Sequence, residues 1–148
     1  MIVIHYPPPD FKMKEQNGRR YLFDPVRKLW VVLTEEEWVR QNFVQYLIKE
    51  LAYPSSLIAI EKEIMLHDLR KRFDVLVYNQ QHQPWMMIEC KSSSVVLNDD
   101  VLQQLLRYHI SVPAAILVVT NGNATYAWEK QNGSLQLLQH LPQWNGNK

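Results

Sequence analysis

The stretch FDVLVYNQQHQPWMMIECK, from Phe73 to Lys91, decides the fold of this 148-residue chain. Its two apolar runs, Phe73–Tyr78 and Trp85–Lys91, predict two strands, and the polar segment Asn79–Pro84 connects them. Two strands separated by so short a connection pair most simply as a hairpin.

Three charged residues interrupt the two apolar strands. The period of two along a strand puts Glu89 and Lys91 on one face and Cys90 on the other. Pairing the strands as a hairpin brings Asp74 near Glu89 and Lys91 at one end of a sheet. Such charges cost desolvation energy unless they serve one another or a metal. Carboxylates select hard cations such as Mg²⁺ or Mn²⁺, and a lysine beside them can hold a phosphate or a metal-bound water.

This arrangement resembles the D…(D/E)xK core of the PD-(D/E)xK nucleases, because Asp74 is followed, after positions 75–88, by Glu89-Cys90-Lys91. Downstream, Gln104 and Tyr108 match the QxxxY motif that follows this core in some branches. With its segments TEEEWVRQ, IECK and VVTNG, the chain is similar to the N-terminal nuclease domain of type I restriction enzyme R subunits, in a small standalone version. The resemblance covers roughly residues 20 to 128.

The resemblance implies an α/β fold with a restriction-endonuclease-like αβββαβ core, in which helices flank a mixed central sheet. The residues offer the same order around the hairpin: a helix that begins at Thr34, a strand over Leu57–Leu66, a helix over Asp99–Ile110 and a strand over Ala114–Thr120. Extra strands are expected at both ends, at Tyr21–Phe23, Leu29–Leu33, Thr125–Trp128 and Leu135–Leu138. We expect one domain, with an N-terminal β extension (1–33), the core (34–128) and a C-terminal strand and tail (129–148).

The chemistry implied by the resemblance is hydrolysis of DNA phosphodiesters with Mg²⁺ or Mn²⁺. Asp74 and Glu89 are expected to hold the ion, with a carbonyl near Cys90 as a possible further ligand. Lys91 is expected to orient or activate the attacking water and to offset charge on the phosphate. Gln104 is expected to steady the lysine or a phosphate.

Composition sets broader limits. The formal net charge of +1 gives no sign of a large nucleic-acid footprint and leaves a local one open. The single cysteine rules out an intramolecular disulfide and suits a reducing cytosol. The N-terminal MIVIHYPPP lacks the features of a signal peptide, and no apolar run approaches the ~20 residues of a membrane-spanning helix. A cytoplasmic protein without membrane contact is expected.

Several charged residues admit two interpretations. The basic segment 12–28 is either a solvated surface or an arm that contacts phosphates. The resemblance suggests a catalytic glutamate at Glu36 or Glu37, whereas the Thr34-x-x-Glu37 capping box gives Glu37 a structural role. On the strand Leu57–Leu66, Glu61 and Glu63 either lean into the metal site or face water.

Two further groups sit near the expected site. Arg70, Lys71 and Arg72 lead straight into Phe73-Asp74, where they can meet a phosphodiester backbone or simply lie in a solvated turn. Tyr108, expected on the buried side of its helix, is either a core residue or a contact to nucleic acid.

Other chemistries are disfavoured. The five histidines show no HxxxH or HExxH spacing, and the sequence has no GxGxxG, GxxxxGK[ST] or GxSxG motif. The leading interpretation is a metal-dependent deoxyribonuclease. The alternative is a nucleic-acid-binding or assembly module that has the fold without the catalysis. A helicase or modification partner, or a second copy of the chain, is a further expected partner.

Overall fold

A computed structural model describes residues 1–146, so the last two residues of the expected tail (129–148) lie outside the described residues. Nine strands and two helices follow one another in the order β1 (Met13–Gln16), β2 (Arg19–Asp24), β3 (Leu29–Val32), α1 (Glu35–Lys49), β4 (Ile58–Leu66), β5 (Leu69–Tyr78), β6 (Pro84–Cys90), α2 (Asp99–His109), β7 (Ile116–Thr120), β8 (Thr125–Gln131) and β9 (Ser134–Leu137). A short 3-10 helix, Ser55–Leu57, precedes β4. The expected αβββαβ order is therefore confirmed by α1-β4-β5-β6-α2-β7.

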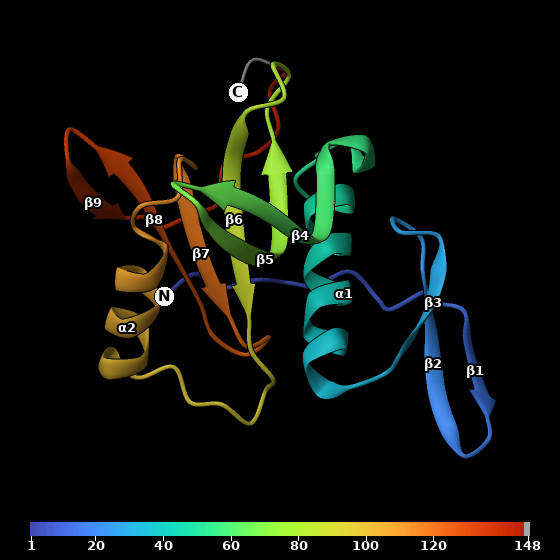
Figure 1. Cartoon of the computed structure of the whole chain (residues 1–148). Coiled ribbons are helices and arrows are strands. Elements are labelled where there is room, and N and C mark those ends of the chain that lie inside the picture. Colours follow the sequence, from blue (N-terminus) through green and yellow to red (C-terminus); the bar gives the residue numbers. More distant parts are fainter. Residues whose placement is uncertain (147–148) are drawn as a thin grey trace.

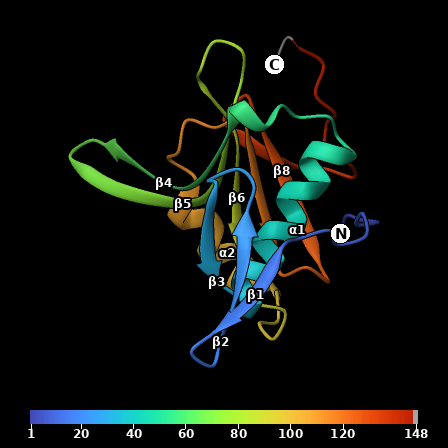
Figure 2. The ribbon, with the colours of Figure 1, turned by 90° about the vertical axis from the view of Figure 1, so that its right-hand side faces the viewer.

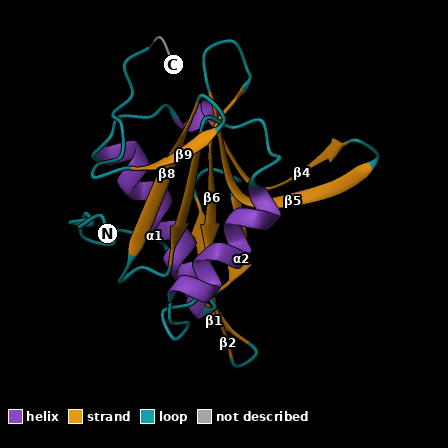
Figure 3. Cartoon of the chain, turned by 90° about the vertical axis from the view of Figure 1, so that its left-hand side faces the viewer, coloured by secondary structure: helices purple, strands orange, loops and turns teal. Residues whose placement is uncertain are grey.

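The central sheet has six strands in the spatial order β4-β5-β6-β7-β8-β9. Its strands pair antiparallel except for β6 and β7, which are parallel and are joined through α2. A parallel pair needs such a crossover because its second strand must start again at the same end as the first. The helices α1 and α2 lie on opposite faces of this sheet (Figures 1 and 3). The expected mixed sheet with flanking helices is thus confirmed.

Alternation along β6 fills both layers of the core. Met86, Ile88 and Cys90 pack in the cluster beneath α1, together with Phe43 and Leu47 of that helix. Met87 lies on the other face, in the cluster that includes Leu76, Leu117 and Leu106. The apolar run of β7 is buried over its whole length because both faces are covered.

The hairpin of β4 and β5 changes face part of the way along its length. Ile60 of β4 belongs to the cluster beneath α1, whereas Ile64 packs with the cluster on the α2 side. Between them Glu61 has φ +55°, which is a rare, left-handed conformation for a residue within a strand. Regular alternation would put Ile58, Ile60, Ile64 and Leu66 on one face, but the backbone at Glu61 interrupts it.

The distal part of this hairpin projects from the body of the protein (Figure 2). Its turn consists of His67 and Asp68, both with positive φ, as in the tight turns that match strand twist. The strand β5 accordingly begins at Leu69. Arg70, Lys71 and Arg72 lie within β5, which corrects the interpretation of this triplet as a turn.

Both helices begin at side-chain caps. Thr34 Oγ1 accepts a hydrogen bond from the Glu37 amide at 3.0 Å, and Asn98 Oδ1 accepts one from the Val101 amide at 3.0 Å. The carboxylate of Glu37, however, does not complete a capping box, because it is bonded to arginine side chains.

The predicted buried side of α2 needs a correction. Leu102 and His109 are its buried residues, whereas Tyr108 is 57% exposed. The core role considered for Tyr108 is therefore wrong.

The terminal strands follow the sequence expectations. At the N-terminus, β1, β2 and β3 form a separate antiparallel sheet that packs beside α1 (Figures 1 and 2). At the other end, β8 and β9 extend the central sheet as an antiparallel hairpin. The expected extra strands at both ends are thus present.

Candidate active site

The site forms where β5 and β6 separate. Their pairing extends to Val75 opposite Ile88, and beyond that pair the side chain of Asp74 takes the place of a backbone acceptor. Asp74 Oδ2 accepts a hydrogen bond from the Cys90 amide at 2.8 Å. The backbone of Lys91, which follows β6, no longer pairs with β5. Its amide donates instead to the Thr120 carbonyl of β7 at 2.8 Å. Divergence of the two strands thus opens a space at the sheet end that carboxylates occupy.

Glu89 and Lys91 lie on one face of β6, as the strand period predicts. Lys91 Nζ is 3.4 Å from Glu89 Oε1. On the same side, His109 Nε2 of α2 is 3.7 Å from Glu89 Oε2, and this histidine is almost fully buried. Glu89 is therefore held between a lysine and an imidazole.

Asp74 and Glu89 are close enough for each carboxyl group to affect the ionisation of the other. Burial, followed by the charge of Glu89, raises the pKa of Asp74 from 3.8 to about 6. Burial also acts to raise the pKa of Glu89, but His109 and Lys91 outweigh it, so this pKa is lowered. Below about pH 6 the pair therefore carries one negative charge, with Glu89 ionised and Asp74 protonated.

Asp74 also contacts α1, which the sequence did not reveal. Arg40 is 4% exposed, and its Nη2 lies 3.2 Å from Asp74 Oδ1. Its Nη1 lies 2.8 Å from Glu37 Oε1 and 3.2 Å from Glu61 Oε1. Regular alternation along β5 would put Asp74 on the face of Leu76 and Tyr78, which pack on the α2 side, so the contact of Asp74 with α1 departs from that alternation.

The ion-pair network extends from Arg40 to the N-terminal sheet. Arg27 follows β2 and pairs with Asp24, with Glu37 and with Glu61. Arg72 of β5 completes the network with a contact of 2.9 Å to Glu61. The interpretation of Glu61 as a solvated edge carboxylate is therefore wrong, because three arginines surround it. Glu63 is about half exposed and lies 3.8 Å from Arg70.

Asp74 and Glu89 supply the carboxylate oxygens that a hard divalent ion prefers as ligands. The two carboxylates repel each other when both are ionised, and the raised pKa of Asp74 reflects this repulsion together with burial. A bound cation would offset the repulsion. Among the described residues, no group of three or more His, Cys, Asp or Glu side chains converges as a metal cage. Mg²⁺ suits such a site because it is commonly held by one or two carboxylates and keeps several waters. The residues present therefore fit this ion.

Cys90 can contribute to such a site only through its backbone. Its thiol is fully buried in the cluster beneath α1, and burial raises its pKa well above the ordinary value. The expectation that the side chain is a core residue is confirmed. Glu36 is half-buried on α1.

Gln104 and Tyr108 lie apart from the carboxylates, on the exposed flank of α2. Gln104 borders a shallow depression together with Asp100 and Arg107, and within the described chain it has no hydrogen bond to Glu89 or Lys91. Lys71 Nζ donates to the Tyr108 carbonyl at 2.6 Å and lies 4.7 Å from the centre of its ring. The residue of α2 that reaches Glu89 is His109, one position after the predicted motif.

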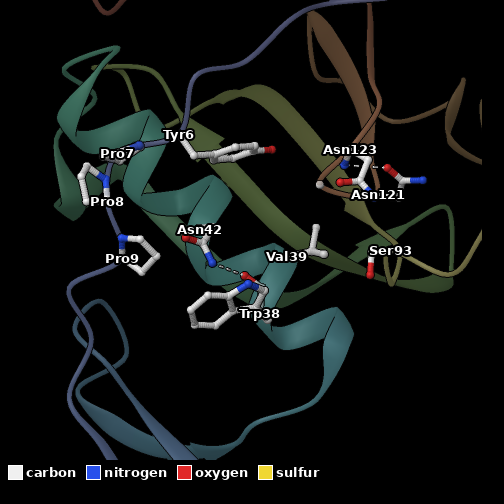
Figure 4. Close-up of a pocket in the computed structure, with 11 residues that line it drawn as sticks. Tyr6, Pro7, Pro8, Pro9, Trp38, Val39, Asn42, Ser93, Asn121 and Asn123 are labelled. Carbon is white, nitrogen blue, oxygen red and sulfur yellow. Dashed lines mark hydrogen bonds between the residues drawn. The ribbon is translucent and has the colours of Figure 1, made fainter.

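A separate cavity of about 470 Å³ opens beside α1 (Figure 4). Its walls come from the segment Tyr6–Pro9, from Trp38 and Asn42 of α1, from Ser93 and from the turn at Asn121–Asn123. Ser93 follows Lys91 by two residues, so the cavity adjoins the loop that leaves the carboxylate site. Asp74 and Glu89 are not among its lining residues.

Comparison with known proteins gives one family. The model described as Type I restriction enzyme R protein N terminus (HSDR_N) matches residues 35–142. No curated protein sequence matches the chain. Among solved structures, a cryo-EM structure of a DrdV–DNA complex matches with a TM-score of 0.47 and 21% identity, covering 71% of this chain and 10% of that chain. Within the described part of the chain, neither helix is long and apolar enough to cross a membrane.

Proposed function

The chain belongs to the family of the type I restriction enzyme R protein N terminus, and from this premise we propose that it is a divalent-metal-dependent nuclease that hydrolyses DNA. The observation that carries the proposal is the convergence of Asp74, Glu89 and Lys91 at the end of β5 and β6. Two carboxylates and a lysine are the groups that this reaction needs, and they come from strands that diverge at this point.

In the proposed reaction, Asp74 and Glu89 hold Mg²⁺ or Mn²⁺, with the backbone carbonyl of Cys90 as a further ligand. The bound ion supplies a Lewis acid and lowers the pKa of water. Lys91 donates hydrogen bonds to the attacking water or to a phosphate oxygen, where negative charge develops in the transition state.

Neighbouring residues hold the two carboxylates in place. Arg40 and the Cys90 amide fix both oxygens of Asp74. His109 and Lys91 contact different oxygens of Glu89. Supporting contacts of this kind set the orientation of groups that bind a metal.

The decisive experiment compares Lys91→Ala with wild type in plasmid and linear-duplex cleavage with Mg²⁺ and with Mn²⁺. We expect the variant to lose cleavage and to retain metal binding, measured by isothermal titration calorimetry, because removal of a nearby cation reduces repulsion of the ion. The charge-matched control is Lys49→Ala at the far end of α1, which should cleave as wild type does.

One observation favours the second candidate, a nucleic-acid-binding module without catalysis. Asp74 already has Arg40 and a backbone amide as partners, so the site can be a structural ion-pair centre. That function predicts that Lys91→Ala weakens DNA affinity while wild type cuts nothing. Wild-type protein that binds DNA but leaves supercoiled, linear and branched substrates uncut with both ions contradicts the nuclease proposal. The same assay with a helicase or modification partner, or at concentrations that favour a dimer, identifies any partner that cleavage requires.

A further inference from the structure

The N-terminal sheet exposes a face of aromatic and basic side chains. The register places Lys14 opposite Tyr21 and Phe23 opposite Trp30, so these side chains share the outer face of the sheet. Lys12 and Arg19 continue the same face at its two ends. We call this surface the aromatic-basic face; it comprises Lys12, Lys14, Arg19, Tyr21, Phe23 and Trp30.

The opposite face of the same sheet is the packed one. Leu22 and Asp24 alternate with the aromatic residues of β2, and both are 0% exposed. Figure 2 shows β1–β3 in front of α1, with the helix behind the sheet. The aromatic-basic face therefore points away from the body of the protein, and Trp30 retains an exposure of 38%.

The face concentrates the positive charge of the chain. The segment 12–32 contains Lys12, Lys14, Arg19, Arg20, Arg27 and Lys28 against Glu15 and Asp24, a net charge of 6 − 2 = +4, whereas the full chain has +1. Asp24 and Arg27 are paired with each other beneath the sheet. The six residues of the aromatic-basic face include three of these cations (Lys12, Lys14 and Arg19) and no acidic residue, so the outward surface is a local basic patch.

The lysines already lie on the aromatic rings. Lys14 Nζ is 4.4 Å from the centre of the Trp30 ring and 5.8 Å from that of Tyr21, and Lys12 Nζ is 5.9 Å from that of Phe23. Such contacts contribute only about 0.5–1 kcal/mol at exposed sites. A ligand that has both a flat ring and an anionic group can therefore replace these weak lysine–ring contacts. Its ring would stack on the aromatic side chain and its anionic group would pair with the lysine.

We propose that the aromatic-basic face binds an unpaired polynucleotide strand, stacking its bases on Trp30 and Tyr21 and contacting its phosphates through Lys12, Lys14 and Arg19. Unpaired strands are the ligand because duplex pairing and stacking hide the base faces that aromatic side chains need. At about 3.4 Å per residue and about 5 Å between strands, the sheet has room for two or three nucleotides.

The proposal goes beyond the nuclease site in two respects. The family match begins at residue 35, so β1–β3 lie outside the region that defines the family. The surface also contains no residue of the carboxylate site, so binding to it needs neither metal nor cleavage. It remains linked to that site, because Arg27 contacts Glu37 and Glu61, and Arg40 joins both to Asp74.

The test is fluorescence anisotropy with a labelled oligothymidylate of about 10 nucleotides and a duplex of equal length, in EDTA so that nothing is cut. We expect tighter binding of the single strand. Trp30→Leu should weaken that binding roughly 5- to 150-fold, the usual loss for one stacked base, while Trp30→Phe keeps most of it. Lys14→Gln should reduce the slope of log affinity against log salt by about 0.7, and Lys49→Gln should leave it unchanged.

Thermal melting of each variant checks the fold, and Lys14→Gln carries the test if Trp30→Leu fails to fold. Equal affinity for single strand and duplex, or wild-type binding by a folded Trp30→Leu and by Lys14→Gln, overturns the proposal. Because the aromatic-basic face shares no residue with the carboxylate site, binding and cleavage can be measured separately. Strand binding without any nuclease activity therefore refutes the proposed function and leaves this inference standing.

Discussion

Replacing Asp74 by Asn should stabilise the metal-free protein at neutral and alkaline pH. Asn has nearly the same shape as Asp, but it cannot carry the charge that burial and Glu89 oppose. Its carbonyl oxygen can still accept the hydrogen bond of the Cys90 amide, but its NH2 group then takes the place of Oδ1 and cannot accept the hydrogen bond of Arg40. The change therefore removes like-charge repulsion and keeps the backbone contact, at the cost of the Arg40 hydrogen bond.

The magnitude follows from the pKa of Asp74, which is about 6 in the folded protein against an ordinary value of 3.8. Because the folded state binds this proton more tightly than the unfolded chain does, ionisation of Asp74 lowers stability as the pH rises from about 4 to about 6. At about 1.4 kcal/mol per pH unit, the ionised group costs about 3 kcal/mol above pH 7. This value is an upper limit for the gain, because Asn loses the attraction between Arg40 and a full negative charge.

Urea denaturation in EDTA at pH 5 and pH 8 measures the effect. The free energy of unfolding of Asp74→Asn should exceed that of wild type by up to about 3 kcal/mol at pH 8, or about 6–12 °C in melting temperature, and by about half as much at pH 5. The exposed Asp10→Asn variant is the control and should show no such pH-dependent gain. Saturating Mg²⁺ should narrow the difference, since only wild type retains both carboxylates. The reasoning is refuted if Asp74→Asn is less stable than wild type at pH 8, or if its advantage grows as the pH falls.

Two further substitutions test contacts that residues of α1 make with the rest of the protein. Arg40→Met should lower the free energy of unfolding by about 3–5 kcal/mol at pH 8, because Glu37, Glu61 and Asp74 lose a buried common partner. The exposed control Arg107→Met should change it little. If urea denaturation of Arg40→Met shows a loss below about 1 kcal/mol, Arg27 and Arg72 are enough to neutralise these carboxylates. Gly122→Ala should lower the free energy of unfolding by more than about 1–2 kcal/mol. Gly122 has φ +90°, and a Cβ added there would lie 3.3 Å from Val39 Cγ2. Gly133→Ala is its control, with φ +80° and no neighbour within 4 Å, and equal losses for the two variants contradict the steric part of the argument.

Patterns local in sequence determined the order of the elements. Apolar runs bounded by turn residues predicted β5, β6 and β7, and the Thr34 cap predicted where α1 begins. The period of two placed Glu89 and Lys91 on one face of β6 and Cys90 on the other, as the structure has them. These predictions hold because each depends on neighbours within one strand or one helical turn.

Only the tertiary structure decided which charged groups surround the two carboxylates. Arg40 meets Asp74 across 34 positions of sequence, and no periodicity marks an arginine on α1 as the partner of an acid on β5. On α2, the rotation of the helix about its axis decides whether His109 or Gln104 points toward Glu89. The apolar stripe of the sequence defines that rotation only to within about one residue. On β4, the backbone of Glu61 leaves the regular strand conformation inside an arginine cluster, and this breaks the alternation used to assign faces. Buried charges are satisfied by whichever partners the folded chain brings within reach, so their pairing is a property of the packed elements and not of any one segment.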